Sequence, residues 1–221
     1  MPALADRIEH TLLSPLATRS MIERHCAQAR SYALFGVCVN SVWVPVCADL
    51  LRSTQVRVVS VVGFPLGANA SAAKAFECEL AISQGAHEID MVLPLGALKA
   101  ADHHAVLEDI SGVVKAAAGR PVKVILETGL LTDPEKRLAC ALAEQAGATF
   151  VKTSTGFARA EPSAPATLGA TLADVALLRE AVGSRLGVKA SGGIRSAGFA
   201  RELVAAGADR IGTSAGPELA L

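Results

Sequence analysis

The sequence predicts an α/β fold, a single-domain TIM (β/α)8 barrel over residues 1–221 with a short N-terminal extension. Short valine- and isoleucine-rich segments alternate with helical segments, which implies a parallel sheet. These apolar segments are nearly continuous, as in strands covered on both faces. A Gly-Ala pair precedes three of the strands, at Gly85, Gly147 and Gly207. Their spacing of about sixty residues corresponds to two βα units of roughly thirty residues each.

Eight strands are expected, each a short β-branched or apolar run bounded by glycine, proline or small polar residues. They cover residues 8–13, 34–40, 56–64, 88–93, 122–127, the start of 149–157, 187–193 and 209–214. Eight units of this length favour a barrel over an open doubly wound sheet. A dinucleotide-binding fold is disfavoured, because no Gly-x-Gly-x-x-Gly motif follows the first strand.

Helices are expected between most of the strands. They cover residues 18–30, 44–51, 71–84, 102–118, 132–146, 172–182 and 196–206. Thr132 and Glu135 have the spacing of a capping box, which marks the start of the fifth helix. Residues 158–169 are rich in proline, alanine and serine, and we expect a loop there.

Composition excludes several classes of function. The chain has 21 basic and 21 acidic residues, so we expect no nucleic-acid or membrane partner. Residues 1–9 lack the apolar core of a signal peptide, which favours the cytoplasm. The five cysteines are scattered and form no Cys-x-x-Cys pair, which argues against a disulfide framework and a structural zinc site. Reduced thiols are the simple interpretation.

Lys152 is the first candidate for chemistry. It lies in an apolar strand that runs into Ser154, Thr155 and Gly156. Side chains alternate along a strand, so Phe150, Lys152 and Ser154 share one face. Burial favours the neutral amine, the form that attacks a carbonyl. The alternative is a lysine whose stem is buried while its amine reaches water.

The neighbouring strands supply further charged groups of the same inward parity. Asp90, Lys123 and Lys189 each lie on the face that we assign to the barrel interior. A second ammonium near Lys152 penalises the charged form of that lysine, and Asp90 can shuttle protons. The alternative is a buried ion pair that serves only to lock the barrel.

Small residues follow the late strands, where active-site loops of this barrel lie. Glycine lets backbone N–H groups approach an anion, so these loops predict a phosphate site. The residues are Gly156, Gly192, Gly193, Gly212 and Ser214.

Five motifs together resemble deoxyribose-phosphate aldolase over nearly the whole chain. They are Val-Lys-Thr-Ser-Thr-Gly-Phe at 151–157, Val-Lys-Ala-Ser-Gly-Gly-Ile-Arg at 188–195, Arg-Ile-Gly-Thr-Ser at 210–214, Glu-Ile-Asp-Met-Val at 88–92 and Val-Lys-Val-Ile-Leu-Glu-Thr at 122–128. The resemblance implies a class I aldolase that needs no metal and no cofactor and is often dimeric. It cleaves 2-deoxy-D-ribose 5-phosphate to D-glyceraldehyde 3-phosphate and acetaldehyde.

The same resemblance assigns roles to residues. Lys152 is implied as the Schiff-base lysine, with Asp90 and Lys189 as the proton donor and acceptor. Gly156, Gly192, Gly193 and Ser214 are implied as phosphate contacts. The predicted substrate-binding set also includes Gly212, Thr11, Cys38 and Lys123.

The chain departs from the family pattern at several positions. Glu9 stands where aspartate is usual, Ser41 where proline is common, and Ala215 where a second serine is frequent. The loop after Phe157 is longer than usual. Two other readings stay open: a different Schiff-base aldolase or transaldolase, and a non-catalytic barrel that binds sugar phosphates.

Overall fold

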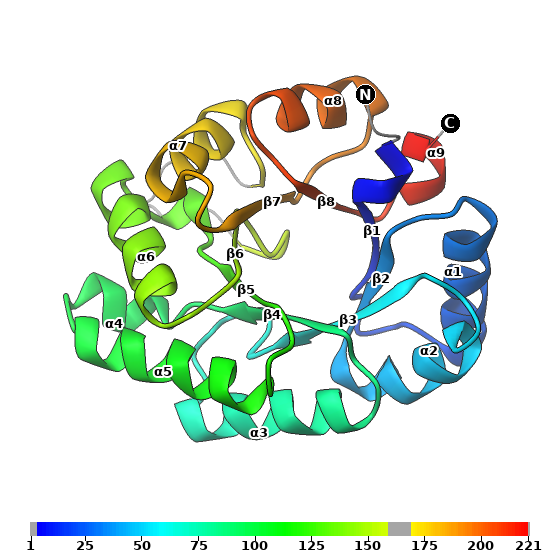
Figure 1. Ribbon diagram of the computed structural model, residues 1–221, viewed down its shortest axis with the longest axis horizontal. Helices are drawn as coiled ribbons and strands as arrows, with labels where there is room; N and C mark the ends of the chain where they lie inside the picture. Colours follow the sequence, from blue (N-terminus) through cyan, green and yellow to red (C-terminus); the bar gives the residue numbers. More distant parts are fainter. Residues whose placement is uncertain (1–3, 159–168, 221) are drawn as a thin grey trace.

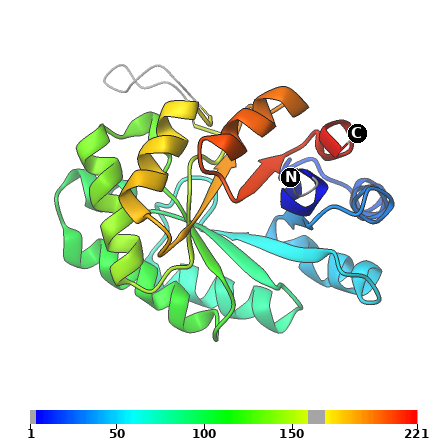
Figure 2. The same cartoon turned by 45° about the horizontal axis from the view of Figure 1, so that its top comes forward.

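The computed structural model describes residues 4–158 and 169–220. Within them, eight parallel strands pair in sequence order and close into a barrel, with β1 paired to β8 (Figure 1). Helices surround the sheet on its outer side (Figure 2). The predicted fold class is thereby confirmed. Most of the loop expected at residues 158–169 lies outside the described residues.

The elements follow one another as alternating strands and helices. The strands are β1 (Ile8–Leu12), β2 (Gly36–Val39), β3 (Arg57–Val62), β4 (Glu88–Val92), β5 (Val122–Ile125), β6 (Phe150–Lys152), β7 (Gly187–Ser191) and β8 (Arg210–Thr213). The α-helices are α1 (Arg19–Ser31), α2 (Val44–Leu51), α3 (Ser71–Ser83), α4 (Leu95–Lys99), α5 (His103–Ala116), α6 (Asp133–Gln145), α7 (Leu172–Val182), α8 (Ala197–Ala205) and α9 (Gly216–Ala220). Three 3-10 helices are η1 (Leu4–Arg7), η2 (Ser41–Trp43) and η3 (Thr128–Leu130).

Several strands end earlier than the sequence predicts. β5 stops at Ile125, because Glu127 adopts a left-handed conformation (φ 55, ψ 61) that a strand cannot accommodate. β7 stops at Ser191, before Gly192 with its φ of 91. The residues lost from these strands form the loops at the carboxyl end of the barrel. The short helices α4 and α9 were not predicted, because a single turn is too short to show helical periodicity.

The hydrophobic core has two unequal parts. The larger part fills the space between the sheet and the surrounding helices. The smaller part lies inside the barrel and contains Leu13, Cys38, Val59 and Val61, with Phe64 packed against it. A TIM barrel interior is usually filled by branched apolar side chains. In this barrel, charged side chains take the place of many of those apolar side chains in the interior.

Strand register places the predicted lysines side by side. Lys152 is paired with Lys189 across β6 and β7, and Asp90 is paired with Lys123 across β4 and β5. All four side chains are buried, and their alternation with apolar residues that face the helices directs them into the barrel. Among the described residues, no helix is long and apolar enough to cross a membrane.

Candidate active site

Lys152 lies at the last position of β6, and its side chain is 3% exposed. Its Nζ donates to Oδ2 of Asp90 over 2.8 Å. Asp90 is completely buried on β4, so this ion pair crosses the barrel interior. A lysine amine at the end of a barrel strand lies where active sites of this fold are built.

Lys189 shares the same carboxylate oxygen. Its Nζ lies 2.6 Å from Oδ2 of Asp90 and also donates to the carboxylate of Glu9. Burial alone would lower the pKa of Lys189, but Asp90 and Glu9 outweigh burial and raise it. Lys189 is therefore held as an ammonium with two carboxylates.

Asp90 stays ionised in spite of its burial. Desolvation would raise its pKa, but the three lysines Lys123, Lys152 and Lys189 hold the pKa of Asp90 well below its usual range. Lys123 donates to Oδ1 of Asp90 over 3.0 Å, and its Nζ lies 2.6 Å from the carboxylate of Glu88. The interior thus holds three lysines against three carboxylates, and their formal charges balance.

A cavity of about 430 Å³ opens at the carboxyl end of the barrel, with Lys152 among the residues that line it. Its other walls come from residues after β1, β6, β7 and β8. Six predicted substrate contacts line it: Thr11, Gly156, Gly192, Gly193, Gly212 and Ser214.

Two of these glycines lie where a side chain would be crowded. A Cβ at Gly192 would lie 3.0 Å from the Cα of Gly169, and its positive φ disfavours other residues. A Cβ at Gly212 would lie 3.1 Å from Cε of Lys189. Glycine at position 212 therefore leaves room for the lysine that pairs with Asp90.

Residues 22–217 match the family described as DeoC/LacD family aldolase. This chain belongs to that family. It is 53% identical over 214 residues to deoxyribose-phosphate aldolase 1 of Bacillus licheniformis, which covers 96% of this chain and 92% of that protein. It is 52% identical over 213 residues to deoxyribose-phosphate aldolase of Lysinibacillus sphaericus, at 96% and 92% coverage.

Solved structures agree with the sequence relatives. A tetrameric deoxyribose phosphate aldolase from Aeropyrum pernix superposes with a TM-score of 0.88 and 37% identity, covering 98% of this chain and 89% of that one. A putative deoxyribose-phosphate aldolase from Coccidioides immitis superposes with a TM-score of 0.92 and 38% identity, covering 100% and 87%. The DeoC/LacD family assignment and the barrel therefore support each other.

Two predicted substrate contacts occupy different places in this DeoC/LacD family member. Among the described residues that line the cavity, neither Cys38 nor Lys123 is found, and both side chains are fully buried. Lys123 lies two residues before Ile125 in β5, and Ile125 is the residue that pairs with Lys152. The structure places Lys123 in the buried charged cluster and Cys38 beside it, and their contact with substrate stays a prediction.

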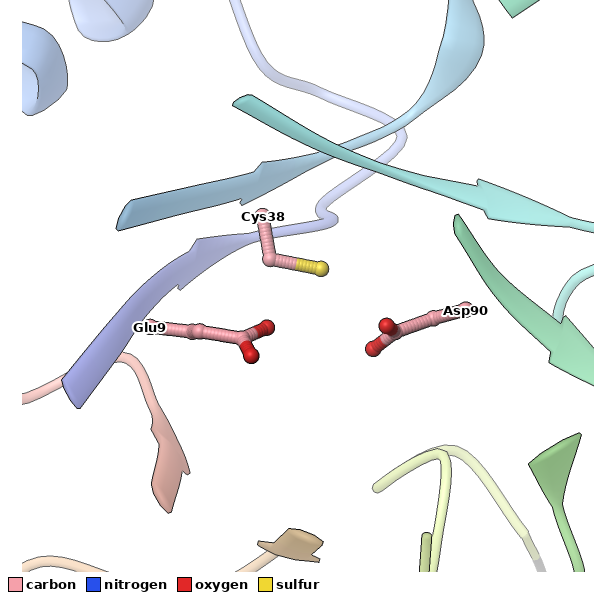
Figure 3. Close-up of side chains that lie close together, drawn as sticks. All are labelled: Glu9, Cys38 and Asp90. Atoms are coloured by element: carbon pink, nitrogen blue, oxygen red, sulfur yellow. The ribbon is translucent and has the colours of Figure 1, made fainter. Parts of the chain in front are cut away.

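Glu9, Cys38 and Asp90 point toward one another inside the barrel (Figure 3), with ligand atoms all within 4.8 Å. Such a set resembles a cation site, but the Lys189 ammonium contacts both carboxylates and already supplies the positive charge. Burial raises the pKa of the Cys38 thiol to about 11, whereas a metal ligand must be a thiolate. The set is thus a counter-ion site for lysine, which does not favour a divalent metal.

Sequence reasoning missed two parts of the site. Glu9 contacts Lys189 directly, although it was singled out only as a departure from the family pattern. Arg195 is exposed and lines the cavity two residues after Gly193. A cation next to a glycine pair was a visible indication of an anion site, because arginine binds phosphate well.

Proposed function

We propose that this chain is a class I aldolase that reversibly cleaves 2-deoxy-D-ribose 5-phosphate to D-glyceraldehyde 3-phosphate and acetaldehyde through a Schiff base on Lys152. One observation carries the proposal beside family membership. Lys152 lines the cavity and is joined through one oxygen of Asp90 to the buried Lys189. A nucleophilic amine, a carboxylate and an ammonium are the groups that imine chemistry requires.

The steps follow from these groups. The neutral amine of Lys152 adds to the C1 aldehyde, and loss of water gives a protonated imine. A base removes the proton of the C3 hydroxyl, the C2–C3 bond breaks, and D-glyceraldehyde 3-phosphate leaves. The bond electrons form an enamine on Lys152, which is protonated at C2 and hydrolysed to acetaldehyde. We assign the proton transfers to Asp90 and Lys189, because Oδ2 of Asp90 lies 2.8 Å from Lys152 Nζ and 2.6 Å from Lys189 Nζ.

We assign phosphate binding to the loops at the cavity wall. Gly156, Gly192 and Gly193 have positive φ values. Backbone segments that include such residues can form a concave nest, in which successive N–H groups point toward a bound anion. Gly212 and Ser214 lie in the same wall, and Arg195 adds a positive charge. Thr11 of β1, the strand paired with β8, also lines the cavity, and we assign it a contact with the sugar.

The test is reductive trapping. Purified protein is treated with acetaldehyde and borohydride, and its intact mass and peptide map are measured. One added ethyl group on Lys152 is expected, together with release of acetaldehyde from deoxyribose 5-phosphate. Absence of any adduct would favour a non-catalytic sugar-phosphate-binding barrel. An adduct with other cleavage products would favour a different Schiff-base aldolase or transaldolase.

We further propose a cytoplasmic homodimer in which residues 1–221 act as one domain. All five cysteines are free and buried, which suits a reducing compartment. The side chains of Phe76 and Leu80 on α3 are 67% and 42% exposed, and exposed apolar surface of this kind favours association. Light scattering of the purified protein measures the mass of the assembly, and a monomer would refute the dimer.

A further inference from the structure

Glu127 takes no part in the steps above, yet it lies beside the cavity in an unusual conformation. Its backbone is left-handed although it is not glycine, and its side chain is 4% exposed. Such a conformation persists only where the surroundings hold it, and it is concentrated at functional sites. Here the flanking backbone is held to β6 by two bonds: Leu126 N donates to Lys152 O, and Thr128 N donates to Thr153 O.

The carboxylate of Glu127 is directed at the loop that follows Lys152. The backbone N–H of Thr155 lies 3.3 Å from Oε1 and 3.2 Å from Oε2. The hydroxyl of Thr155 also donates to Oε2. Both donors of one residue thus converge on one carboxylate.

The contacts continue along the loop. Oγ1 of Thr155 accepts a hydrogen bond from Phe157 N over 3.0 Å. The ring of Phe157 packs edge-on against Phe64 of the inner apolar cluster, with centroids 5.2 Å apart. Thr155, Gly156 and Phe157 all line the cavity, so this chain of contacts fixes one of its walls.

Among residues 4–158 and 169–220, none of the ion pairs includes Glu127. A buried carboxylate without a cation is costly and is seldom kept for stability alone. The Thr155 hydroxyl has one proton, which goes to Glu127, so its oxygen stays free to accept from Phe157.

We propose that Glu127 is a positioning residue that holds the wall formed by Thr155, Gly156 and Phe157 in the geometry that binds the phosphorylated sugar. The inference rests on the proposed aldolase function. It adds a determinant of substrate affinity that lies outside the imine chemistry. Acetaldehyde carries no phosphate, so its capture by Lys152 is independent of this wall.

The experiment compares Glu127→Leu and Thr155→Val with Thr155→Ser. The first two remove the acceptor or the hydroxyl and should raise the KM for deoxyribose 5-phosphate about tenfold, the effect of losing one hydrogen bond to a charged group. Their kcat and their rate of borohydride trapping with acetaldehyde should change much less. Thr155→Ser retains the hydroxyl and should keep the KM near that of the original protein.

Glu135→Leu is the matched control. The carboxylate of Glu135 also accepts from a threonine backbone and hydroxyl, those of Thr132, over 2.8 Å and 2.9 Å, but it caps α6 outside the cavity. This variant should lose stability without a change in KM. An unchanged KM in Thr155→Val, or a trapping rate that falls in parallel with turnover, would overturn the positioning role.

Calorimetric binding of deoxyribose 5-phosphate separates this inference from the proposed function. If the original protein binds the sugar phosphate but forms no adduct, the aldolase assignment fails. In that case, about tenfold weaker binding by Thr155→Val would support the positioning role, and unchanged binding would refute it. Circular dichroism shows which variants are folded, and Thr155→Val provides the test if Glu127→Leu does not fold.

Discussion

The protein buries lysine in contrasting surroundings, among them the interior of the barrel and the interface between α3 and α5. In the interface, Lys74 Nζ lies 2.7 Å from Oδ2 of Asp109 and 3.0 Å from the carbonyl oxygen of Val92. Burial lowers the pKa of Lys74 more than its single carboxylate raises it. In the barrel, Asp90 and Glu9 together reverse the effect of burial on Lys189.

This comparison shows how a structural ion pair differs from a reactive cluster of charged groups. A single carboxylate does not offset the lowering of the lysine pKa by burial. Two carboxylates do offset it and keep the lysine protonated. The structural pair is sealed between helices and sheet, with exposed side-chain fractions of 0% and 1%. The barrel cluster reaches a cavity through Lys152. A lock made of one lysine and one aspartate does exist in this protein, but it lies outside the barrel.

The largest expected effect comes from Lys152→Arg. Guanidinium keeps the positive charge for Asp90 but is not deprotonated in proteins, so it forms no imine. Turnover should fall by about four orders of magnitude or more, as for loss of a covalent nucleophile. The measurements are acetaldehyde release and borohydride trapping. Lys74→Arg is the control and should retain both per folded molecule; turnover by Lys152→Arg above a trace would remove the assignment.

The next effect concerns stability. Lys74→Met leaves Asp109 buried without its cation and should lower the free energy of unfolding by roughly 3–5 kcal/mol. Urea unfolding measures this change. Trapping at Lys152 by the remaining folded protein should be unaltered, because Lys74 lies outside the barrel interior.

The double variant Lys74→Met with Asp109→Leu sharpens this test. It removes both charges and should recover most of the lost stability, as apolar replacements of buried pairs often do. If the double variant is as unstable as Lys74→Met, the pair stabilises the fold by more than charge compensation. The contrast with the barrel cluster would then lose its basis.

A smaller effect is expected from Glu9→Gln. Two carboxylates raise the pKa of Lys189, so removing one of these charges should lower it. If the ammonium of Lys189 is needed for turnover, the fall of kcat/KM at high pH should begin at lower pH. Glu88→Gln is the matched control, because the Glu88 carboxylate pairs with Lys123 instead. Equal pH profiles in both variants would argue against the Glu9 contact.

The sequence predicted the barrel and the inward lysines for a simple reason. Side chains alternate along a strand with period two, so the face of Lys152, Lys189 and Asp90 is known once the strands are known. The height of a side chain along the barrel axis depends on the stagger between strands, which no local pattern reports. The inward face of Lys123 could therefore be predicted, but its depth in the barrel could not.

The contact between Glu9 and Lys189 could not be predicted for a related reason. It joins residues 180 positions apart and exists only because closure of the barrel brings β1 beside β8. Whether the carboxylate reaches the amine then depends on the length of the glutamate side chain. The left-handed conformation of Glu127 was equally hidden, because β-rich sequence continues through that position.

The smallest effect is expected from Cys38, the uncharged neighbour of the barrel cluster. Its thiol points into the barrel, where a reactive thiolate would meet aldehydes formed in the cavity. The structure buries it completely, and burial raises the pKa of the thiol to about 11, so the nucleophilic thiolate is scarce at neutral pH. Cys38→Ala removes no ion pair and should change kcat/KM by less than about fivefold, since it leaves every charge compensated.

The same variant decides whether the thiol reacts at all. Inactivation by excess acetaldehyde should proceed at the same rate in Cys38→Ala as in the original protein. Loss of the unmodified mass of the peptide that contains residue 38 gives an independent readout. If Cys38→Ala resists inactivation, the thiol is accessible in solution and reacts as a thiolate. Solvent would then reach the barrel interior beyond Lys152. The difference in solvent access between the barrel interior and the buried Lys74–Asp109 pair would be larger than the burial of Cys38 implies.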